Sequence, residues 1–198
     1  PLLLISGERQ AYKEELEVER TTLGHVHPNV AVTLTNIGQI YKIRGEFSPA
    51  LSIYKEAVSI QRRTLDKPTA EVSATLSSIA YIHDRTNQLS EALQVYQEVI
   101  CIQHDVYGER SLESSSTLNS IGLVLFKMDM HELALESFRE SLNIRRNKLG
   151  KDHHDVAIVL YNIATVHLDL GDDEEALAYY RETLRVEQVS LGESHKDV

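Results

Sequence analysis

The histidines are the residues of this sequence that most invite a chemical role, because nine occur and imidazole is a common metal ligand. His25 and His27 lie close together, as do His153 and His154, and the slot of His27 and His153 recurs at His195. A zinc site needs three or four ligands around one point. These slots are separated by multiples of 42 residues, which places them in different structural repeats. We therefore expect no metal site and no cofactor.

The sequence contains none of three common motifs for phosphate binding or nucleophilic catalysis, GxxxxGK(S/T), GxGxxG and GxSxG. Cys101 stands between Ile100 and Ile102 in a predicted helix, where we expect a small buried apolar side chain rather than a nucleophile. His83 and His167 share one slot of another helix and are expected to be packing residues that need a hydrogen-bond partner. We predict that the chain is not an enzyme.

Composition and net charge limit the classes of partner and the cellular location that we expect for this chain. The formal net charge of −10 argues against a nucleic-acid binder, which needs a basic face. The opening apolar run, residues 2–5, is far too short to cross a membrane, so we expect no membrane insertion. A single cysteine excludes an internal disulfide and indicates a reducing compartment, so we expect a cytoplasmic, intracellular protein. Other proteins remain as the expected partners.

The elements that carry these residues repeat every 42 residues, and the pair Leu23-Gly24 recurs in register as Leu65-Asp66, Tyr107-Gly108, Leu149-Gly150 and Leu191-Gly192. The first half of each repeat carries a leucine, then an isoleucine three residues on, then a small residue: Leu34, Ile37 and Gly38; Leu76, Ile79 and Ala80; Leu118, Ile121 and Gly122; Leu160, Ile163 and Ala164. The second half carries an alanine and then an aromatic residue: Ala50 and Tyr54, Ala92 and Tyr96, Ala134 and Phe138, Ala176 and Tyr180. Spacings of three and four residues place each set on one helical face. Each repeat is therefore predicted to be two helices, called here helix A and helix B.

Turn and cap signals support this division. Gly45 and Gly171 mark the turn between helix A and helix B, and Asn87 and Asp129 hold that slot in the other repeats. The slot expected to open helix A holds Asn29, Glu71, Glu113, Asp155 and Asp197. We expect the Asn and Asp residues of this slot to be N-caps.

The predicted organisation is an all-α solenoid of stacked antiparallel helix pairs. It consists of an unpaired helix B of a truncated repeat (5–24), four repeats (25–66, 67–108, 109–150 and 151–192) and the start of a further repeat (193–198). We expect both ends to be cut from a longer array, because the chain opens with a helix B that lacks its helix A and stops in the first residues of a further repeat.

The repeat pattern L-x-x-(I/L)-(G/A) followed by A-L-x-x-(Y/F) resembles the tetratricopeptide repeat. The 42-residue period with L-G-x-x-H-P between units, present as Leu23-Gly24-His25-Val26-His27-Pro28, is similar to the repeats of kinesin light chains. The second and third repeats depart from that family by losing the His-Pro pair. The resemblance implies a superhelix in which the A helices line a concave groove that holds peptides or helices of partners.

Groove residues follow from the same resemblance. The expected partner-binding residues are Asn36, Gln39, Lys42, Ser78, Tyr81, Arg85, Asn119, Leu123, Phe126, Lys127, Tyr161, Asn162 and Thr165. Family members often use an Asn of helix A to clamp a peptide backbone, although such an Asn can equally bond a neighbouring helix. The tyrosines are interpreted either as aromatic anchors or as half-buried packing residues. The basic side chains near the ends of three A helices suit an acidic partner, or are simply solvated.

The functional hypothesis is a protein-interaction scaffold or adaptor that binds partner segments in the groove, with a kinesin light chain-like cargo adaptor as one form of it. One alternative is a structural spacer, or an element that associates with itself through its convex face or truncated ends. Another is a regulatory fragment of a larger multidomain protein.

Overall fold

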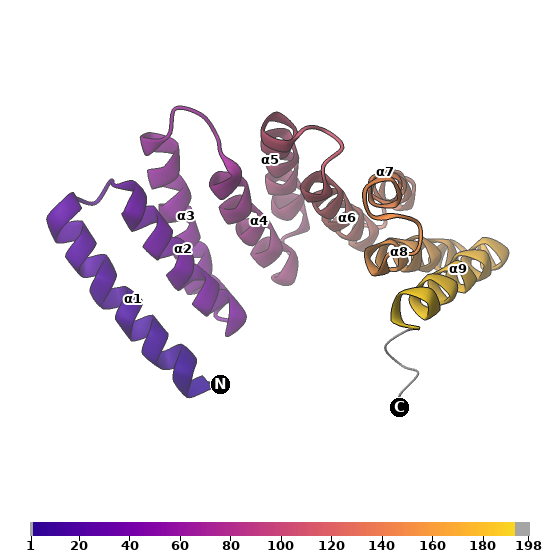
Figure 1. Ribbon diagram of the computed structural model, residues 1–198, viewed down its shortest axis with the longest axis horizontal. Helices are drawn as coiled ribbons and strands as arrows, with labels where there is room; N and C mark the ends of the chain where they lie inside the picture. The colour runs from indigo at the N-terminus through magenta and orange to yellow at the C-terminus, as the bar shows by residue number, and fades with distance from the viewer. Residues whose placement is uncertain (1, 193–198) are drawn as a thin grey trace. The chain divides into compact units, whose positions relative to one another are not determined.

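The computed structural model describes residues 2–192, with the side chains of residues 11–190 and 192. Over these residues it contains nine α-helices and no strand (Figure 1). The helices are α1 (Leu2–Leu23), α2 (Pro28–Ile43), α3 (Phe47–Thr64), α4 (Ala70–Arg85), α5 (Leu89–Tyr107), α6 (Leu112–Lys127), α7 (His131–Leu149), α8 (His154–Leu170) and α9 (Asp173–Leu191). The predicted all-α class is confirmed.

Each of the four proposed repeats holds one shorter helix followed by one longer helix. The A helices, α2, α4, α6 and α8, have 16 or 17 residues, and the B helices, α3, α5, α7 and α9, have 18 or 19. Helix α1 occupies the place of the unpaired helix B. The start of a further repeat at 193–198, with His195 and Asp197, lies outside the described residues.

The chain forms two compact units, Pro1–Ile102 and Gln103–Val198, with the boundary inside α5. In the first unit α1 packs on α2, and α3 packs on both α2 and α4. In the second unit α7 packs on both α6 and α8, and α8 packs on α9. Successive helices therefore share apolar surface within each unit, as the repeat pattern predicted.

The apolar seam is built from the slots that the repeat defines. All eight leucines and isoleucines of the two helix A slots are at most 9% exposed. In the first unit they join two clusters: one contains Leu16, Leu34, Ile37 and Ile60, and the other contains Tyr54, Leu76, Ile79, Val99 and Ile102. Burial of apolar area, at about 25 cal/mol per Å², is the main stabilising term in such a seam.

Four equivalent turns join the two helices of each repeat. The residues in the predicted turn slot adopt positive φ angles: 73° at Gly45, 60° at Asn87, 58° at Asp129 and 79° at Gly171. In the first repeat the Glu46 amide donates to the Tyr41 carbonyl at 2.9 Å and the Gly45 amide donates to the Lys42 carbonyl at 3.0 Å. This pair of bonds is a Schellman motif, which satisfies helix-end carbonyls and fixes the direction in which helix B leaves.

The helix N-caps differ from the prediction. Asn29 and Asp155 lie inside their helices, and the caps are His27 and His153, two residues earlier. Each cap imidazole accepts a hydrogen bond at Nδ1, from the Asn29 amide at 3.2 Å and from the Asp155 amide at 3.1 Å. The predicted caps were wrong because an imidazole nitrogen takes the place that a Ser, Asp or Asn oxygen usually fills.

Cys101 also departs from the prediction, because its side chain is exposed. Ile102 beside it is 6% exposed and belongs to the core. Successive residues of a helix point about 100° apart, so a neighbour of a seam residue turns outward. The apolar residues beside Cys101 in sequence were therefore a poor guide to its burial.

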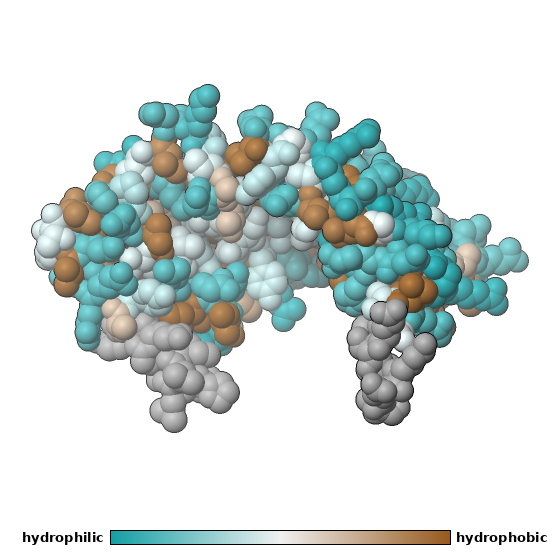
Figure 2. Space-filling view, in the orientation of Figure 1, coloured by the Kyte–Doolittle hydropathy of each residue, from teal (hydrophilic) through white to brown (hydrophobic). Residues whose placement is uncertain are grey.

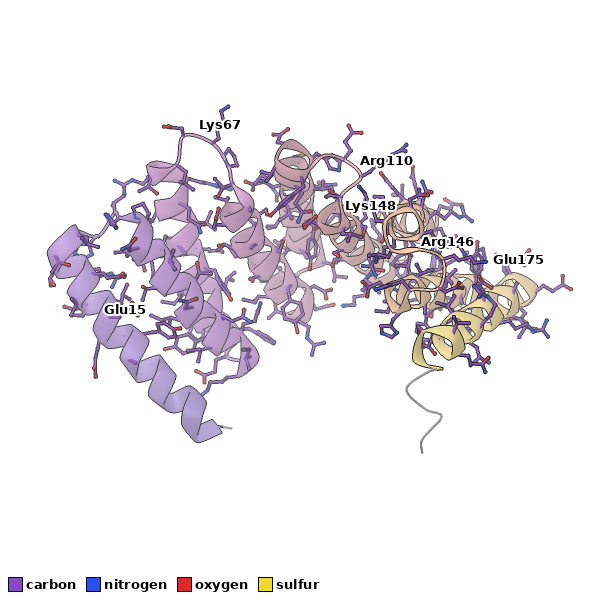
Figure 3. The ribbon with its side chains drawn as sticks, viewed as in Figure 1. Glu15, Lys67, Arg110, Arg146, Lys148 and Glu175 are labelled. Carbon is purple, nitrogen blue, oxygen red and sulfur yellow. The ribbon has the colours of Figure 1, made fainter. Side chains whose placement is uncertain are left out.

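Polar side chains cover most of the visible surface, with apolar residues in small groups among them (Figure 2). The loops between repeats are also polar, and Lys67 and Arg110 extend from two of them (Figure 3). None of the described helices is long and apolar enough to cross a membrane.

The tightest packing within a repeat joins the small slot of helix A to the aromatic slot of helix B. A Cβ atom added to Gly38 would lie 2.8 Å from Cε1 of Tyr54, and one added to Gly122 would lie 2.6 Å from Cε1 of Phe138. Tyr54 and Phe138 are 0% and 1% exposed, so neither ring has room to retreat. Glycine is required at these two positions by close approach, with no demand on φ.

We predict that Gly122→Val lowers the free energy of unfolding by about 2 kcal/mol, because the added methyl groups overpack the Phe138 ring. Ala178→Val is the control, since it places the same β-branched residue at an exposed position of a helix B. That control should cost less than about 0.7 kcal/mol, the range of helix propensities. Urea denaturation of both variants measures the difference, and equal losses would contradict the proposed close approach.

Candidate functional site

Lys42 is the centre of the most connected group of predicted groove residues in the first unit. Its Nζ donates to the Ser78 hydroxyl at 3.1 Å, which links α2 to α4. The same ammonium lies 5.8 Å from the ring centroid of Tyr81 and 6.0 Å from that of Tyr54. The Tyr54 hydroxyl in turn donates to Oε1 of Gln39 at 3.1 Å. Four predicted groove residues, Gln39, Lys42, Ser78 and Tyr81, are therefore connected to one another, directly or through Tyr54. We call these five residues the Lys42 cluster, and their binding role stays a prediction.

Partial burial shapes the electrostatics of the Lys42 cluster. Desolvation lowers the pKa of Lys42, because the half-buried ammonium has lost part of its hydration. Desolvation also raises the pKa of the Tyr54 hydroxyl, and a hydrogen bond with Ser78 offsets part of that rise. The ammonium thus has one hydroxyl and two ring faces as neighbours, and desolvation alone accounts for its lowered pKa.

The Lys42 cluster is open to solvent on one side. Tyr81 is 42% exposed, and Gln39 is also exposed, whereas Tyr54 is fully buried. A desolvated cation next to an exposed ring can hold an anionic group of a partner while the ring covers apolar surface. This arrangement is suited to binding a partner segment.

The second unit carries a different group on its A helices. Nδ2 of Asn162 donates to Oδ1 of Asn119 at 2.8 Å, which joins α8 to α6. Each of these side chains therefore uses part of its capacity on the neighbouring helix, as the packing interpretation of the Asn residues anticipated. A side-chain amide has two donor hydrogens and two acceptor lone pairs, so this one bond does not use the full capacity of either residue.

Tyr161 is the exposed aromatic residue of this group, at 53%. Its ring meets that of Tyr180 edge to face, with centroids 5.5 Å apart. The Tyr180 hydroxyl lies 3.3 Å from the Thr165 hydroxyl, so Tyr180 connects two predicted site residues. The packing on one edge fixes the Tyr161 ring while leaving much of it open to solvent.

The end of α6 holds a further aromatic contact. Phe126 meets the His131 ring edge to face at 5.6 Å, and Nε2 of His131 lies 2.7 Å from Oδ2 of Asp169. Leu123, one turn earlier in α6, is 37% exposed. Phe126 is partly buried, so part of its ring packs within the protein and part faces solvent.

Three predicted residues lie outside these groups. Asn36 is partly buried on α2, and Arg85 and Lys127 are exposed at the ends of α4 and α6. Lys42 and Arg85 belong to the first unit and Lys127 to the second, so the basic row stays a prediction.

Sequence reasoning missed Tyr54, Tyr180 and His131 as members of these groups. Tyr54 and Tyr180 were assigned to the seam, yet their hydroxyls reach residues of the groove face. Tyrosine in place of phenylalanine in the aromatic slot was the available signal, because a buried hydroxyl needs a partner. Phe138, which lacks the hydroxyl, holds the same slot in the third repeat.

The histidines take structural roles where the structure describes their contacts. His83 and His167 are each 7% exposed. Their Nδ1 atoms lie 2.6 Å from Oε1 of Gln88 and 3.2 Å from Oδ2 of Asp172, so the expectation that they are packing residues with hydrogen-bond partners is confirmed. Over the described residues, no group of three or more His, Cys, Asp or Glu side chains is placed to hold a metal ion.

We predict that the pKa of the Lys42 ammonium lies below the ordinary value for lysine. An NMR titration of labelled lysine Cε atoms measures it. Because folding lowers this pKa, the folded chain loses the proton at a lower pH than the unfolded chain does. The unfolded chain then binds more protons in the alkaline range, so the free energy of unfolding gains a contribution that rises with pH. Lys42→Met should lack that contribution, and an ordinary pKa for Lys42 would contradict the described burial.

Comparison with known proteins identifies the repeat. One family model described as tetratricopeptide repeat matches residues 9–63 and 113–187, and a second model of the same description matches residues 72–113. Among curated protein sequences, none matches the chain.

Solved structures share the fold at low sequence identity. The structure of BtubC (BKLC) from P. vanneervenii has a TM-score of 0.76 at 19% identity, covering 93% of this chain and 72% of that one. A structure of nearly identical TPR-like repeats from Podosopora anserina, named for kinesin light chain, has a TM-score of 0.81 at 15% identity, covering 97% and 89%. MamA has a TM-score of 0.70 at 19% identity, covering 95% and 91%. With family models matching most of its length, the chain belongs to the tetratricopeptide repeat family.

Proposed function

We propose that this chain is a protein-interaction scaffold that binds segments of partner proteins on the faces of its A helices. The observation that carries the proposal is the Lys42 cluster, in which a desolvated cation lies beside the exposed Tyr81 ring. Proteins of the tetratricopeptide repeat family are generally non-enzymatic scaffolds, which supports binding as the role of this face.

The chemistry of the Lys42 cluster favours a partner segment with an acidic side chain near an apolar one. A carboxylate that reaches Lys42 would form an ion pair with its half-buried ammonium. Tyr81 would cover the adjacent apolar side chain, since tyrosine offers a large ring at low entropic cost. In the second unit, Tyr161 would bind a further ring, and the amide groups of Asn119 and Asn162 would bind the partner backbone with the capacity that their mutual hydrogen bond leaves.

The finer role that we propose is that of an adaptor: this chain binds one partner, and other parts of the assembly bind the remaining components. Similarity to a structure named for kinesin light chain supports this role, together with the 42-residue period of the repeats. A cytoplasmic location is part of the same proposal, because the lone cysteine of the chain favours a reducing compartment.

We predict that Tyr81→Ala and Tyr161→Ala each reduce recovery of bound partners in quantitative co-purification with the chain as bait. Loss of an aromatic anchor costs about 2 kcal/mol, which is roughly a thirtyfold loss of affinity. Tyr107→Ala is the matched control, because Tyr107 is 44% exposed but lies at the end of a helix B. Circular dichroism of each variant checks that the fold is retained.

Partners that survive both helix A substitutions but are lost with Tyr107→Ala would contradict the proposed face. A chain that captures no partner and sediments as a stable dimer would favour the self-association alternative instead.

A further inference from the structure

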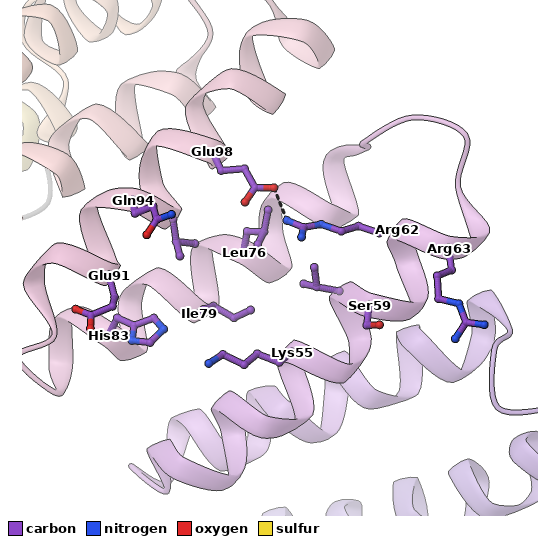
Figure 4. Close-up of a pocket in the computed structure, with 12 residues that line it drawn as sticks. Lys55, Ser59, Arg62, Arg63, Leu76, Ile79, His83, Glu91, Gln94 and Glu98 are labelled. Carbon is purple, nitrogen blue, oxygen red and sulfur yellow. Dashed lines mark hydrogen bonds and ion pairs between the residues drawn. The ribbon is translucent and has the colours of Figure 1, made fainter.

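A hollow on the first unit lies outside the Lys42 cluster. It encloses about 590 Å³ between α3 and α5, with part of α4 as its floor (Figure 4). Leu76, Ile79 and His83 of α4 form the floor, and Val58 and Val95 contribute apolar walls. The rim is polar, with Lys55 and Arg63 on α3 and Glu91 and Gln94 on α5. An apolar floor with a few polar groups at the rim is the usual composition of a ligand pocket.

One end of the hollow is closed by an ion pair between Arg62 and Glu98 (Figure 4). The pair has equivalents elsewhere in the chain: Arg20 and Glu56 at 2.5 Å, and Arg146 and Glu182 at 3.9 Å. Because the same pairing joins successive B helices in other repeats, we assign Arg62 and Glu98 to the scaffold. The ion pair is therefore part of the packing between α3 and α5 and need not serve a ligand.

The fourth repeat carries an aromatic ring at the equivalent position. Two periods after His83 stands His167, with the same burial and a Nδ1 contact to the equivalent turn residue. The slot of Val95 holds Tyr179, whose ring stacks on the His167 ring with centroids 5.6 Å apart and planes 9° apart. In the second repeat the imidazole is present and held in the same way, but the stacking ring is missing.

We propose that this hollow is a binding site for an aromatic side chain of a partner protein, which stacks on His83 as Tyr179 stacks on His167. With valine in place of tyrosine, no ring stacks on the His83 imidazole in the way that Tyr179 stacks on His167, and the hollow borders Leu76 and Ile79, which are each 4% exposed. A tyrosine or tryptophan suits the site, because the ring covers the floor while its polar atom meets the rim.

This site is independent of the scaffold function proposed for the A helices. It is formed by α3, α5 and the side of α4 that carries Leu76, Ile79 and His83, whereas the Lys42 cluster uses Ser78 and Tyr81 of α4. Substitutions in one site should leave the other unchanged, so their tests can fail separately.

The test uses N-acetyl-tyrosinamide as the probe and NMR of the whole chain as the readout. We expect saturable shifts of the His83 ring protons and the Ile79 and Val95 methyl groups. N-acetyl-leucinamide is the aliphatic control and should bind about threefold to tenfold more weakly, the range expected for a stacking contribution of an aromatic pair.

Val95→Tyr should fill the hollow with the ring that the fourth repeat carries, and reduce probe affinity at least tenfold. Gln97→Tyr is the matched control, because it adds a tyrosine at an exposed position of α5 that does not line the hollow, and it should keep wild-type affinity. His83→Leu is a second variant, which introduces the residue type that Leu125 holds in the same slot of the third repeat, and it should abolish the preference for the aromatic probe.

Three results would overturn the proposal. These are an absence of saturable shifts at His83, an equal affinity for the aromatic and aliphatic probes, and unchanged binding in Val95→Tyr. A dimer of the chain that Val95→Tyr dissociates would overturn the assignment to a partner protein, since a second copy would then supply the ring.

Discussion

Contact between an aromatic ring of helix B and a helix A position with almost no side chain sets the geometry of each repeat. At Gly38 and Gly122 the nearest ring carbon lies only 2.8 Å and 2.6 Å from where a Cβ atom would be, so the two backbones approach more closely than a larger side chain would allow. That approach brings the flanking leucine and isoleucine slots into the same seam, where every member is at most 9% exposed. The remaining surfaces of both helices are then left for neighbours and ligands.

The two candidate sites are consequences of this packing on different sides of the helices. On the A helices, the tyrosine hydroxyls of the aromatic slot reach past the small residues and contact Gln39 and Thr165. The groove face is thus tied to the seam, and Lys42 is held over a ring that cannot move away. On the B helices, a hollow lies beside Val95, in the slot that holds Tyr179 in the fourth repeat.

Much of the fold was predictable because each position of the repeat occurs four times in the sequence, so its residue type can be compared between repeats. The left-handed turn slot could be identified even with Asn87 and Asp129 in it, since Gly45 and Gly171 hold the same place. The caps were missed because histidine is an unusual capping residue, and Cys101 was misplaced because its sequence neighbours lie on another face of the helix. Contacts between repeats, such as Lys42 with Ser78, depend on the offset between stacked helices, which residue spacing does not encode.

Amide hydrogen exchange of the native chain tests most directly whether the seam holds the repeats together. The A helices contribute the most completely buried residues, including Leu160 and Ile163 of α8 at 0% exposure, whereas α9 leaves Leu177 and Leu184 about half exposed. If the seam has this role, exchange should be slowest in the middle of α2, α4 and α8, and faster in the outer turns of α9. Protection that follows helix length alone, with the B helices slower than the A helices, would contradict this role of the seam.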